Sequence, residues 1–336
     1  MARDRSSPTP AQAIAKWLAA PATAAWLREH LGGRVAGLES VQTLWSGYGE
    51  IVRVQLENAT VPSVIVKWVA PPRRAEHPRG WSGHASHQRK LRSYAVEERF
   101  YRDWCPVGAS DRHRTATCHL AESTDDGWRF VLEDLDAAGF AGRRRDLRGP
   151  PLDQCLDWLA SFHAHFVGRG AAGLWPIGTY WHLDTRADEL AAMADPELRA
   201  AAPRLDAALN ACGYQTLVHG DAKVANFCFG DNAVAAVDFQ YVGGGCGIKD
   251  VAYFLSSCLS DAQCEAQAPR HLDHYFGRLR ERLGPDIDAD AVENEWRALY
   301  PAAWADFHRF LNGWAPDHWK IHRYTRLMTE VALAAL

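Results

Sequence analysis

The most constraining feature of this sequence is the segment 217–250, where polar residues follow two short apolar runs. The first run, Leu-Val-His-Gly, predicts a short strand and then a loop that carries Asp221 and Asn226. The second run, Ala-Val-Ala-Ala-Val, predicts another buried strand with Asp238 at its end. Phosphoryl transfer requires such a set, because one carboxylate steers the proton of an attacking hydroxyl while an amide oxygen and a second carboxylate hold Mg²⁺.

The same residues resemble the catalytic segment of protein-kinase-like enzymes that act on small molecules. HGDAKVAN at 219–226, followed by VDFQ at 237–240, is similar to the aminoglycoside phosphotransferase, choline kinase and ecdysteroid-kinase-like families. Protein kinases have H-R-D-x-x-x-x-N followed by D-F-G. Here Gly220 replaces the arginine and Gln240 replaces the last glycine, which is typical of the small-molecule branch and argues against a protein kinase.

This resemblance implies a role for each polar residue of the segment. Asp221 would be the catalytic base, and Asn226 and Asp238 would be the metal ligands. Lys223 matches a lysine of many protein kinases and would neutralise phosphate charge. The alternative is a polar turn without function, but the apolar run before the motif and the Val-Asp-Phe after it favour the catalytic interpretation.

Composition limits the remaining classes of function. With 37 Lys and Arg against 41 Asp and Glu, the net charge is −4, which offers no basic surface for nucleic acid and no strong field for a membrane. No run of 18 apolar residues occurs, and the eight cysteines show no C-x-x-C pair. We therefore expect a cytoplasmic protein with reduced thiols whose partner is a small hydroxyl substrate, and the oligomeric state stays open.

The region before residue 70 predicts helices at 11–31 and then a β-rich block at 35–69. Within this block, Gly47 and Gly49 lie in a turn between two strands. In kinases such a turn covers the ATP phosphates, since glycine lets backbone N–H groups approach closely. An ordinary hairpin would have the same pattern.

Lys67 lies inside an apolar strand, where an inward lysine needs a partner. It resembles the kinase lysine that binds the α- and β-phosphates and pairs with a helix glutamate. The run 90–104 predicts that helix, with Glu97 as the preferred partner and Glu98 as the second choice. A surface lysine on an edge strand is the structural alternative. Residues 70–89, rich in Pro, Gly and Arg, predict a long loop.

The segment 130–135, Phe-Val-Leu-Glu-Asp-Leu, follows predicted strands at 116–121 and 128–132. It resembles the kinase hinge, where backbone groups near Glu133 and Leu135 would bind adenine. The domain boundary is predicted here.

The rest of the chain predicts mainly helices, at 152–166, 184–194, 196–212, 251–259, 269–283, 290–312 and 317–335. The glycines at 243–247 predict a flexible turn. In the aminoglycoside phosphotransferase family a matching aspartate braces the catalytic loop, so the resemblance implies a structural role for Asp250. Aromatic residues at 296, 300, 304 and 307 share one helical face, which is either core or part of an acceptor site.

The predicted fold is therefore a bilobal, protein-kinase-like α+β protein, with a small β-rich N-lobe at 1–132 and a larger, mainly helical C-lobe at 133–336. The predicted function is an ATP-dependent, Mg²⁺-dependent O-phosphotransferase for an apolar or amphiphilic alcohol. An aminoglycoside or other antibiotic kinase, a choline-type amino-alcohol kinase and a nucleotide-binding pseudokinase are the alternatives.

Overall fold

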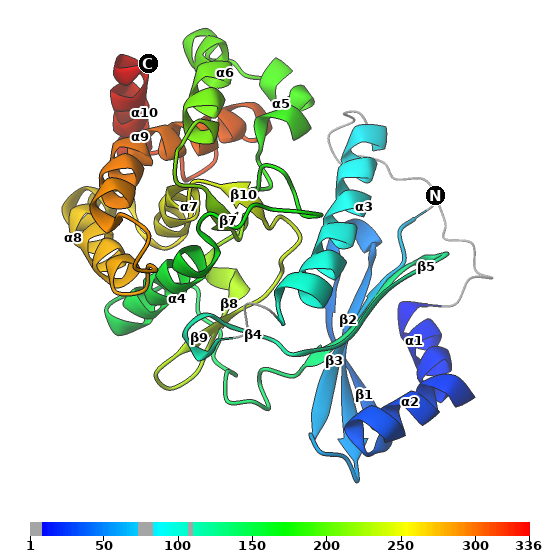
Figure 1. The fold of residues 1–336 in the computed structure, drawn as a ribbon. Coiled ribbons are helices and arrows are strands. Elements are labelled where there is room, and N and C mark those ends of the chain that lie inside the picture. The colour runs from blue at the N-terminus through cyan, green and yellow to red at the C-terminus, as the bar shows by residue number, and fades with distance from the viewer. Residues whose placement is uncertain (1–8, 73–82, 107–109) are drawn as a thin grey trace. The chain divides into compact units, whose positions relative to one another are not determined.

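The computed structural model describes residues 9–72, 83–106 and 110–336 (Figure 1). The chain forms two compact units. The first consists of Met1–Pro106 and Ala116–Ala141, and the second of Val107–Thr115 and Gly142–Leu336. The sequence-based boundary at 132/133 falls inside the first unit, near its end, and the assignment of functional lobes stays a prediction.

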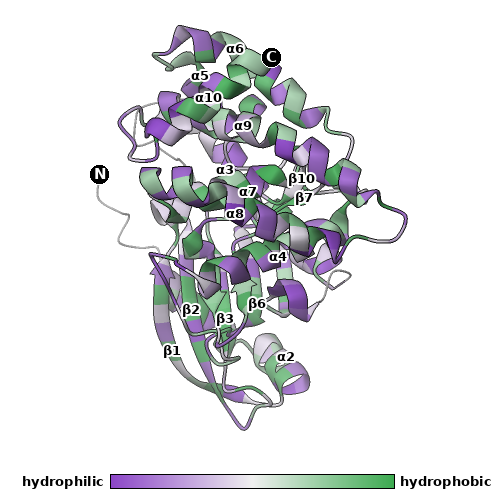
Figure 2. Cartoon of the chain, turned by 90° about the vertical axis from the view of Figure 1, so that its left-hand side faces the viewer, coloured by the Kyte–Doolittle hydropathy of each residue, from purple (hydrophilic) through white to green (hydrophobic). Residues whose placement is uncertain are grey.

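The first unit is built on a five-stranded sheet in which every neighbouring pair is antiparallel. The strands, in spatial order, are β1 (Arg34–Thr43), β2 (Gly49–Glu57), β3 (Ser63–Val69), β6 (Gly127–Glu133) and β5 (Cys118–Thr124). Strand β1 is an edge strand, and Figure 2 shows hydrophilic and hydrophobic residues mixed along it.

Two N-terminal helices cover part of this sheet, as the sequence predicts. Helix α1 (Pro10–Ala19) begins at a capping box formed by Thr9 and Gln12, and α2 (Pro21–Leu31) ends at Gly32 in the left-handed conformation. Their buried residues join those of the sheet in one apolar cluster: Ile14, Leu18, Leu27, Leu31, Val52, Val54, Leu56, Val64, Val66 and Val131.

The next helix, α3 (Gly83–Arg99), begins earlier than the sequence predicts and continues into a π-helical turn, Phe100–Trp104. The predicted loop at 70–89 is thus too long at its C-terminal end, because the polar residues from 83 onward are helical. Its central part, 73–82, lies outside the described residues.

The second unit is mainly helical, and the confirmed fold class is α+β. Its longer helices are α4 (Pro150–Phe166), α6 (Pro196–Asn210), α7 (Ile248–Cys258), α8 (Asp261–Arg280), α9 (Ala289–Trp314) and α10 (Arg323–Ala335). The predicted helix at 184–194 is reduced to a 3₁₀ turn, Leu183–Thr185, and a short helix α5, Ala187–Ala191. Short strands are β4 (Arg114–Thr115), β7 (Thr216–Val218), β8 (Phe227–Phe229), β9 (Val234–Ala236) and β10 (Gly243–Gly245).

The glycine run after Asp238 corrects a prediction, because it is not a flexible turn. Gly243–Gly245 forms β10 and pairs antiparallel with β7. A Cβ at Gly243 would lie 2.2 Å from the carbonyl oxygen of Trp175, and one at Gly244 would lie 2.7 Å from that of Pro176. Glycine is required here because another backbone packs directly against the strand.

Candidate active site

The loop that the sequence predicts to be catalytic begins where β7 ends and turns sharply at Gly220. This residue has φ of 80°, and a Cβ there would lie 2.1 Å from the carbonyl oxygen of Tyr241. Only glycine combines this conformation with such a close approach. The turn places Asp221 directly after the strand, as the sequence predicts, with 6% of its surface exposed.

Asp221 is the centre of a hydrogen-bonded cluster in the second unit. Lys223 Nζ donates to its Oδ2 over 2.7 Å, and Asn226 Nδ2 donates to the same oxygen over 3.1 Å. Tyr253 on α7 donates its hydroxyl to Oδ1 over 3.0 Å. The structure therefore brings Asp221, Lys223 and Asn226 together and adds Tyr253, which sequence reasoning did not identify.

Two pKa shifts describe the electrostatics of this cluster. Burial acts to lower the pKa of Lys223, but the charge of Asp221 and the hydrogen bond to it outweigh burial, and the pKa is raised. Burial and then the charge of Asp221 raise the pKa of Tyr253 well above its usual value. Lys223 thus stays cationic and Tyr253 stays a neutral donor at physiological pH.

Asp250, at the start of α7, holds the backbone before Asp221. Its Oδ2 accepts from the N–H of His219 over 2.5 Å, and its Oδ1 accepts from that of Gly220 over 3.0 Å. His163 Nε2 lies 3.2 Å from Oδ2, and Tyr275 contacts the other nitrogen of that ring. Asp250 is fully buried, so water does not compete for these hydrogen bonds, and they hold the turn in place.

Asp238 follows β9 and has φ of 71°, a conformation that is uncommon for a residue other than glycine. The preceding residue, Val237, donates its N–H to the carbonyl oxygen of Asn226 over 3.0 Å and accepts from His219 Nε2 at 3.1 Å. These bonds tie the segment with Asp238 to the segment with Asn226. Such backbone strain often marks a functional site.

In the first unit, Lys67 on β3 is buried and pairs with Glu97 on α3. Its Nζ lies 2.7 Å from both carboxylate oxygens. The side chains are 7% and 2% exposed. Glu97 is therefore the partner in this structure, whereas Glu98 contacts Arg102 one helical turn further along.

The predicted glycine-bearing turn joins β1 and β2 through a short 3₁₀ turn, Trp45–Gly47. The N–H of Gly47 donates to the carbonyl of Leu44 over 3.1 Å, so a phosphate could take this donor only if that bond opened. A Cβ at Gly49 would lie 1.9 Å from the carbonyl oxygen of Trp68. Packing alone therefore accounts for glycine at position 49, and its role toward the ATP phosphates stays a prediction.

The predicted hinge is anchored by a residue that the sequence did not single out. Asp134 accepts from Arg53 Nε and from Ser63 Oγ, each over 2.6 Å. The N–H of Glu133 donates to Thr117, and the carbonyl of Leu135 accepts from Phe140, both over 2.8 Å. These two backbone groups already have partners inside the unit, and their role toward adenine stays a prediction.

All four residues of the aromatic face predicted on α9, Trp296, Tyr300, Trp304 and Phe307, are buried in the core. Phe307 differs in its neighbours, because it packs in a cluster with Tyr253, the hydrogen-bond donor to Asp221. This aromatic cluster consists of Trp181, Tyr253, Phe307, Phe310 and Leu311, with Tyr180, Trp314 and Ile321 packed against it.

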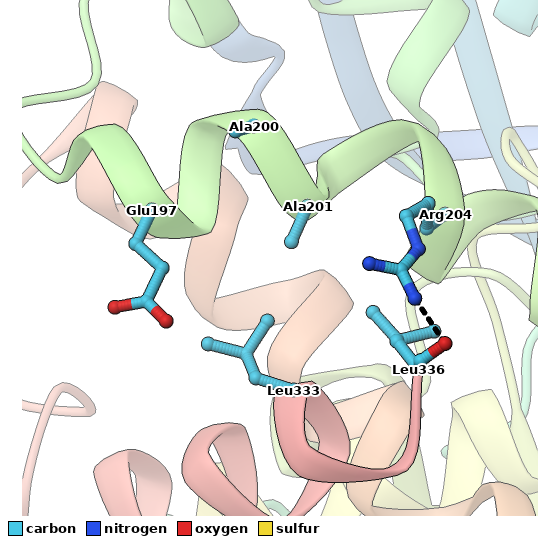
Figure 3. A pocket seen from close by; sticks show the side chains of 6 residues that line it. All are labelled: Glu197, Ala200, Ala201, Arg204, Leu333 and Leu336. Atoms are coloured by element: carbon cyan, nitrogen blue, oxygen red, sulfur yellow. Dashed lines mark hydrogen bonds between the residues drawn. The ribbon is translucent and has the colours of Figure 1, made fainter.

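A cavity of about 230 Å³ lies at the surface of the second unit. Figure 3 shows the side chains that line it. It is lined by residues of α6 and of the C-terminal end, including Glu197, Arg204 and Leu336. Arg204 donates to the backbone oxygen of Leu336 across it. No predicted site residue lines this cavity, so it is separate from the Asp221 cluster.

None of the helices that the structure describes is long and apolar enough to cross a membrane.

Residues 185–284, which include the whole Asp221 cluster up to α7, match the model of the ecdysteroid kinase-like family. The resemblance to small-molecule kinases is confirmed. No curated protein matches the sequence.

Several solved structures of small-molecule kinases are similar over most of the chain. They include a microcompartment-associated aminopropanol kinase (15% identity, TM-score 0.46, covering 94% of each chain). An amicoumacin kinase in complex with AMP-PNP, Ca²⁺ and amicoumacin has 14% identity and a TM-score of 0.49, covering 96% of this chain and 94% of its own. A choline/ethanolamine kinase family protein from Mesorhizobium loti has 13% identity and a TM-score of 0.47, covering 97% and 92%.

Proposed function

We propose that this protein is an ATP-dependent O-phosphotransferase that transfers the γ-phosphate to a hydroxyl of a small, apolar or amphiphilic alcohol. The observation that supports it best is the set of donors around Asp221. Three donors use its two oxygens: two bind Oδ2 and one binds Oδ1. A carboxylate offers about four lone-pair sites, so capacity for one more hydrogen is left on Oδ1.

An acceptor hydroxyl bound at Oδ1 of Asp221 would be oriented as the nucleophile. In the transfer step its oxygen forms a bond to the γ-phosphorus, the bond from that phosphorus to the β,γ-bridging oxygen breaks, and ADP leaves. Asp221 takes the hydroxyl proton. The ammonium of Lys223, 2.7 Å from the other carboxylate oxygen, keeps the carboxylate in place and offsets phosphate charge.

The side chains also fit a Mg²⁺ ion. Asn226 donates twice through Nδ2, to the carboxylate and to the backbone oxygen of Asp221. Its amide oxygen is therefore the atom left for a cation, and Asp238 adds a carboxylate; both are the hard ligands that Mg²⁺ prefers. When bound with ATP, the ion would neutralise charge that develops on the phosphates.

Lys67, Glu97 and the backbone near Gly47, Gly49, Glu133 and Leu135 would bind the nucleotide. The buried Lys67–Glu97 pair supports this, because the desolvation of two buried charges offsets most of their attraction, and stability alone gives little reason to keep the pair. Held by the carboxylate of Glu97, this ammonium would keep a fixed position for contact with phosphate oxygens.

The acceptor class is inferred from what lies beside Asp221. The ring of Tyr253 packs against Phe307 and Tyr180, with centroids 5.0 and 5.6 Å away. An apolar alcohol could place its carbon skeleton against such rings. The carboxylate of Asp306 contacts Trp181 of the same cluster, but it is buried and paired with Arg309, so it offers no site for a polycation.

The experiment is an ATP-consumption screen over a library of alcohols, repeated with Asp221→Asn. Asparagine is nearly the same size but cannot take the proton, and loss of a general base typically costs ~10²–10⁴ in rate. We expect the variant to bind nucleotide and to lose at least ~10² in turnover. Near-normal turnover on a confirmed substrate would remove Asp221 from the mechanism.

A further inference from the structure

A buried lysine occupies the aromatic surface next to Asp221. Lys320 lies in the segment 315–322 between α9 and α10 and is 8% exposed. Its Nζ lies 4.6 Å from the ring centroid of Tyr253, 5.2 Å from that of Phe307 and 5.6 Å from that of Trp319. We call these three rings the aromatic cage. Cation–π attraction of this geometry favours a positive charge.

The ammonium has few other partners. It donates to Ser256 Oγ over 3.3 Å, and within the described parts of the chain no carboxylate forms an ion pair with it. Burial lowers the pKa of Lys320 to about 8, and the charge of Asp221 opposes that effect. The lysine is still mainly cationic at neutral pH, and the ring faces supply much of what replaces its hydration.

The cage is directly connected to the reacting centre. The same tyrosine whose ring lies under the ammonium donates its hydroxyl to Oδ1 of Asp221, the oxygen proposed to receive the acceptor. One aromatic ring therefore separates Lys320 from the place of the acceptor hydroxyl. An acceptor with more than a few carbon atoms would extend along this ring or its neighbours.

A second cation contacts two further rings of the aromatic cluster. The guanidinium carbon of Arg186 lies 5.0 Å from the ring centroid of Phe310 and 5.8 Å from that of Tyr180. Arg186 is buried and held by Glu189, 2.9 Å away. Four rings of the aromatic cluster are thus already in contact with cations of the chain itself: Tyr253 and Phe307 with Lys320, and Tyr180 and Phe310 with Arg186.

We propose that Lys320 is a specificity-determining residue: its ammonium fills the aromatic cage with a resident cation, so that the site takes uncharged alcohols and excludes cationic ones such as amino alcohols and quaternary ammonium alcohols. This inference rests on the proposed function. A cationic acceptor would have to meet the positive charge of Lys320 at a distance of one ring, whereas an uncharged alcohol would not be repelled.

The test compares choline with its uncharged isostere, 3,3-dimethylbutan-1-ol, as acceptors in ATP consumption. The variants are Lys320→Ala, which empties the cage, Lys320→Met, which keeps the volume without the charge, and Lys320→Arg, which keeps the charge. For the wild type we expect kcat/KM to favour the uncharged alcohol at least tenfold. This ratio should fall at least tenfold in Lys320→Ala and severalfold in Lys320→Met, and it should stay above ten in Lys320→Arg.

A binding measurement separates this inference from the proposed function. Tetramethylammonium is titrated against each protein with Trp fluorescence as the readout, since Trp319 forms one wall of the cage and is 61% exposed. We expect at least tenfold tighter binding to Lys320→Ala than to wild type, and no gain for Lys320→Arg. If no alcohol stimulates turnover, the proposed function fails while this result still stands.

Two outcomes would overturn the role of Lys320. One is tetramethylammonium binding to wild type as tightly as to a folded Lys320→Ala protein. The other is a wild type that phosphorylates choline as well as the isostere. If circular dichroism shows that Lys320→Ala does not fold, Lys320→Met decides: affinity for tetramethylammonium equal to that of wild type contradicts the inference.

Discussion

Asp250 provides the sharpest test of how the catalytic loop is held. The change to alanine removes the acceptor of two buried backbone N–H groups, those of His219 and Gly220, and a neighbour of His163. Each buried donor left without a partner costs about 1–3 kcal/mol, so two donors predict a loss of ~2–6 kcal/mol. That is a large part of the stability of an ordinary domain, about 5–15 kcal/mol.

The change to asparagine is milder and easier to measure. One oxygen remains as an acceptor, while the new NH₂ group faces a donor, so we expect a loss of ~1–3 kcal/mol. Urea unfolding followed by circular dichroism gives the free energy, with Asp231→Asn at an exposed loop position as the matched control. The control should change stability by less than ~0.5 kcal/mol.

Amide hydrogen exchange gives a local measure of the same contact. The N–H groups of residues 219 and 220 should exchange faster in Asp250→Asn, while those of α10 should not change. The reasoning is refuted if Asp250→Asn unfolds at the same urea concentration as wild type, or if its exchange rates at these two residues are unaltered.

Three other changes have expected outcomes. Glu97→Gln breaks a buried ion pair and should cost ~3–5 kcal/mol in urea unfolding, whereas Glu98→Gln breaks a half-exposed pair and should cost ~0.3–0.5 kcal/mol; equal effects would contradict the assigned partner. Gly220→Ala should cost more than ~2 kcal/mol, because a steric clash adds to the backbone strain of ~1 kcal/mol. Gly139→Ala is the matched control, since it carries the strain without the clash. Burial lowers the pKa of His308 from 6.5 to about 4, so the unfolded state binds the proton at a higher pH than the folded state does. Stability should therefore fall by up to ~3 kcal/mol as the pH drops from 6.5 to 4. In His308→Gln this part of the pH dependence should be absent from the unfolding curves.

The sequence predicted the parts of the site that depend on local patterns. Asp221 and Asn226 are five residues apart in one loop, so their proximity needs no long-range information. The Lys67–Glu97 pair required more, namely an apolar strand, a following helix and a resemblance that suggested the pairing. The structure provides that ion pair, but its contact with nucleotide stays a prediction, as do the roles of the other site residues.

Long-range packing decided what the sequence could not show. The glycines of β10 suggested flexibility, because glycine has the largest conformational freedom of any residue. They are instead enclosed by β7 and by the segment around Trp175, which lies about seventy positions earlier in the chain. The same run of glycines is compatible with a flexible turn and with an enclosed strand, and only the position of the neighbouring segments decides between the two.

Lys320 was missed for the same reason. Its neighbours Tyr253 and Phe307 come from two other helices, and nothing in the surrounding Trp-Lys-Ile-His distinguishes it from a surface lysine. A buried cation beside the catalytic loop becomes visible only when α7, α9 and the 315–322 segment are brought together.

Helix α7 unites most of these contacts and did carry a readable signal. Asp250, Tyr253 and Ser257 are spaced by three and four residues and so lie on one face of an otherwise largely apolar helix. Each holds a different part of the catalytic loop: Asp250 binds the backbone before Asp221, Tyr253 binds its carboxylate, and Ser257 Oγ accepts the N–H of Val224 over 3.2 Å. Polar residues in such a stripe need partners when they are buried.

Because the three bonds share one rigid element, the same helix positions the carboxylate that would receive the acceptor and the turn that carries this carboxylate. Lys320 contacts that helix at Tyr253 and Ser256. In the proposed mechanism, selection of the acceptor by Lys320 and orientation of Asp221 as the base would thus be coupled through α7.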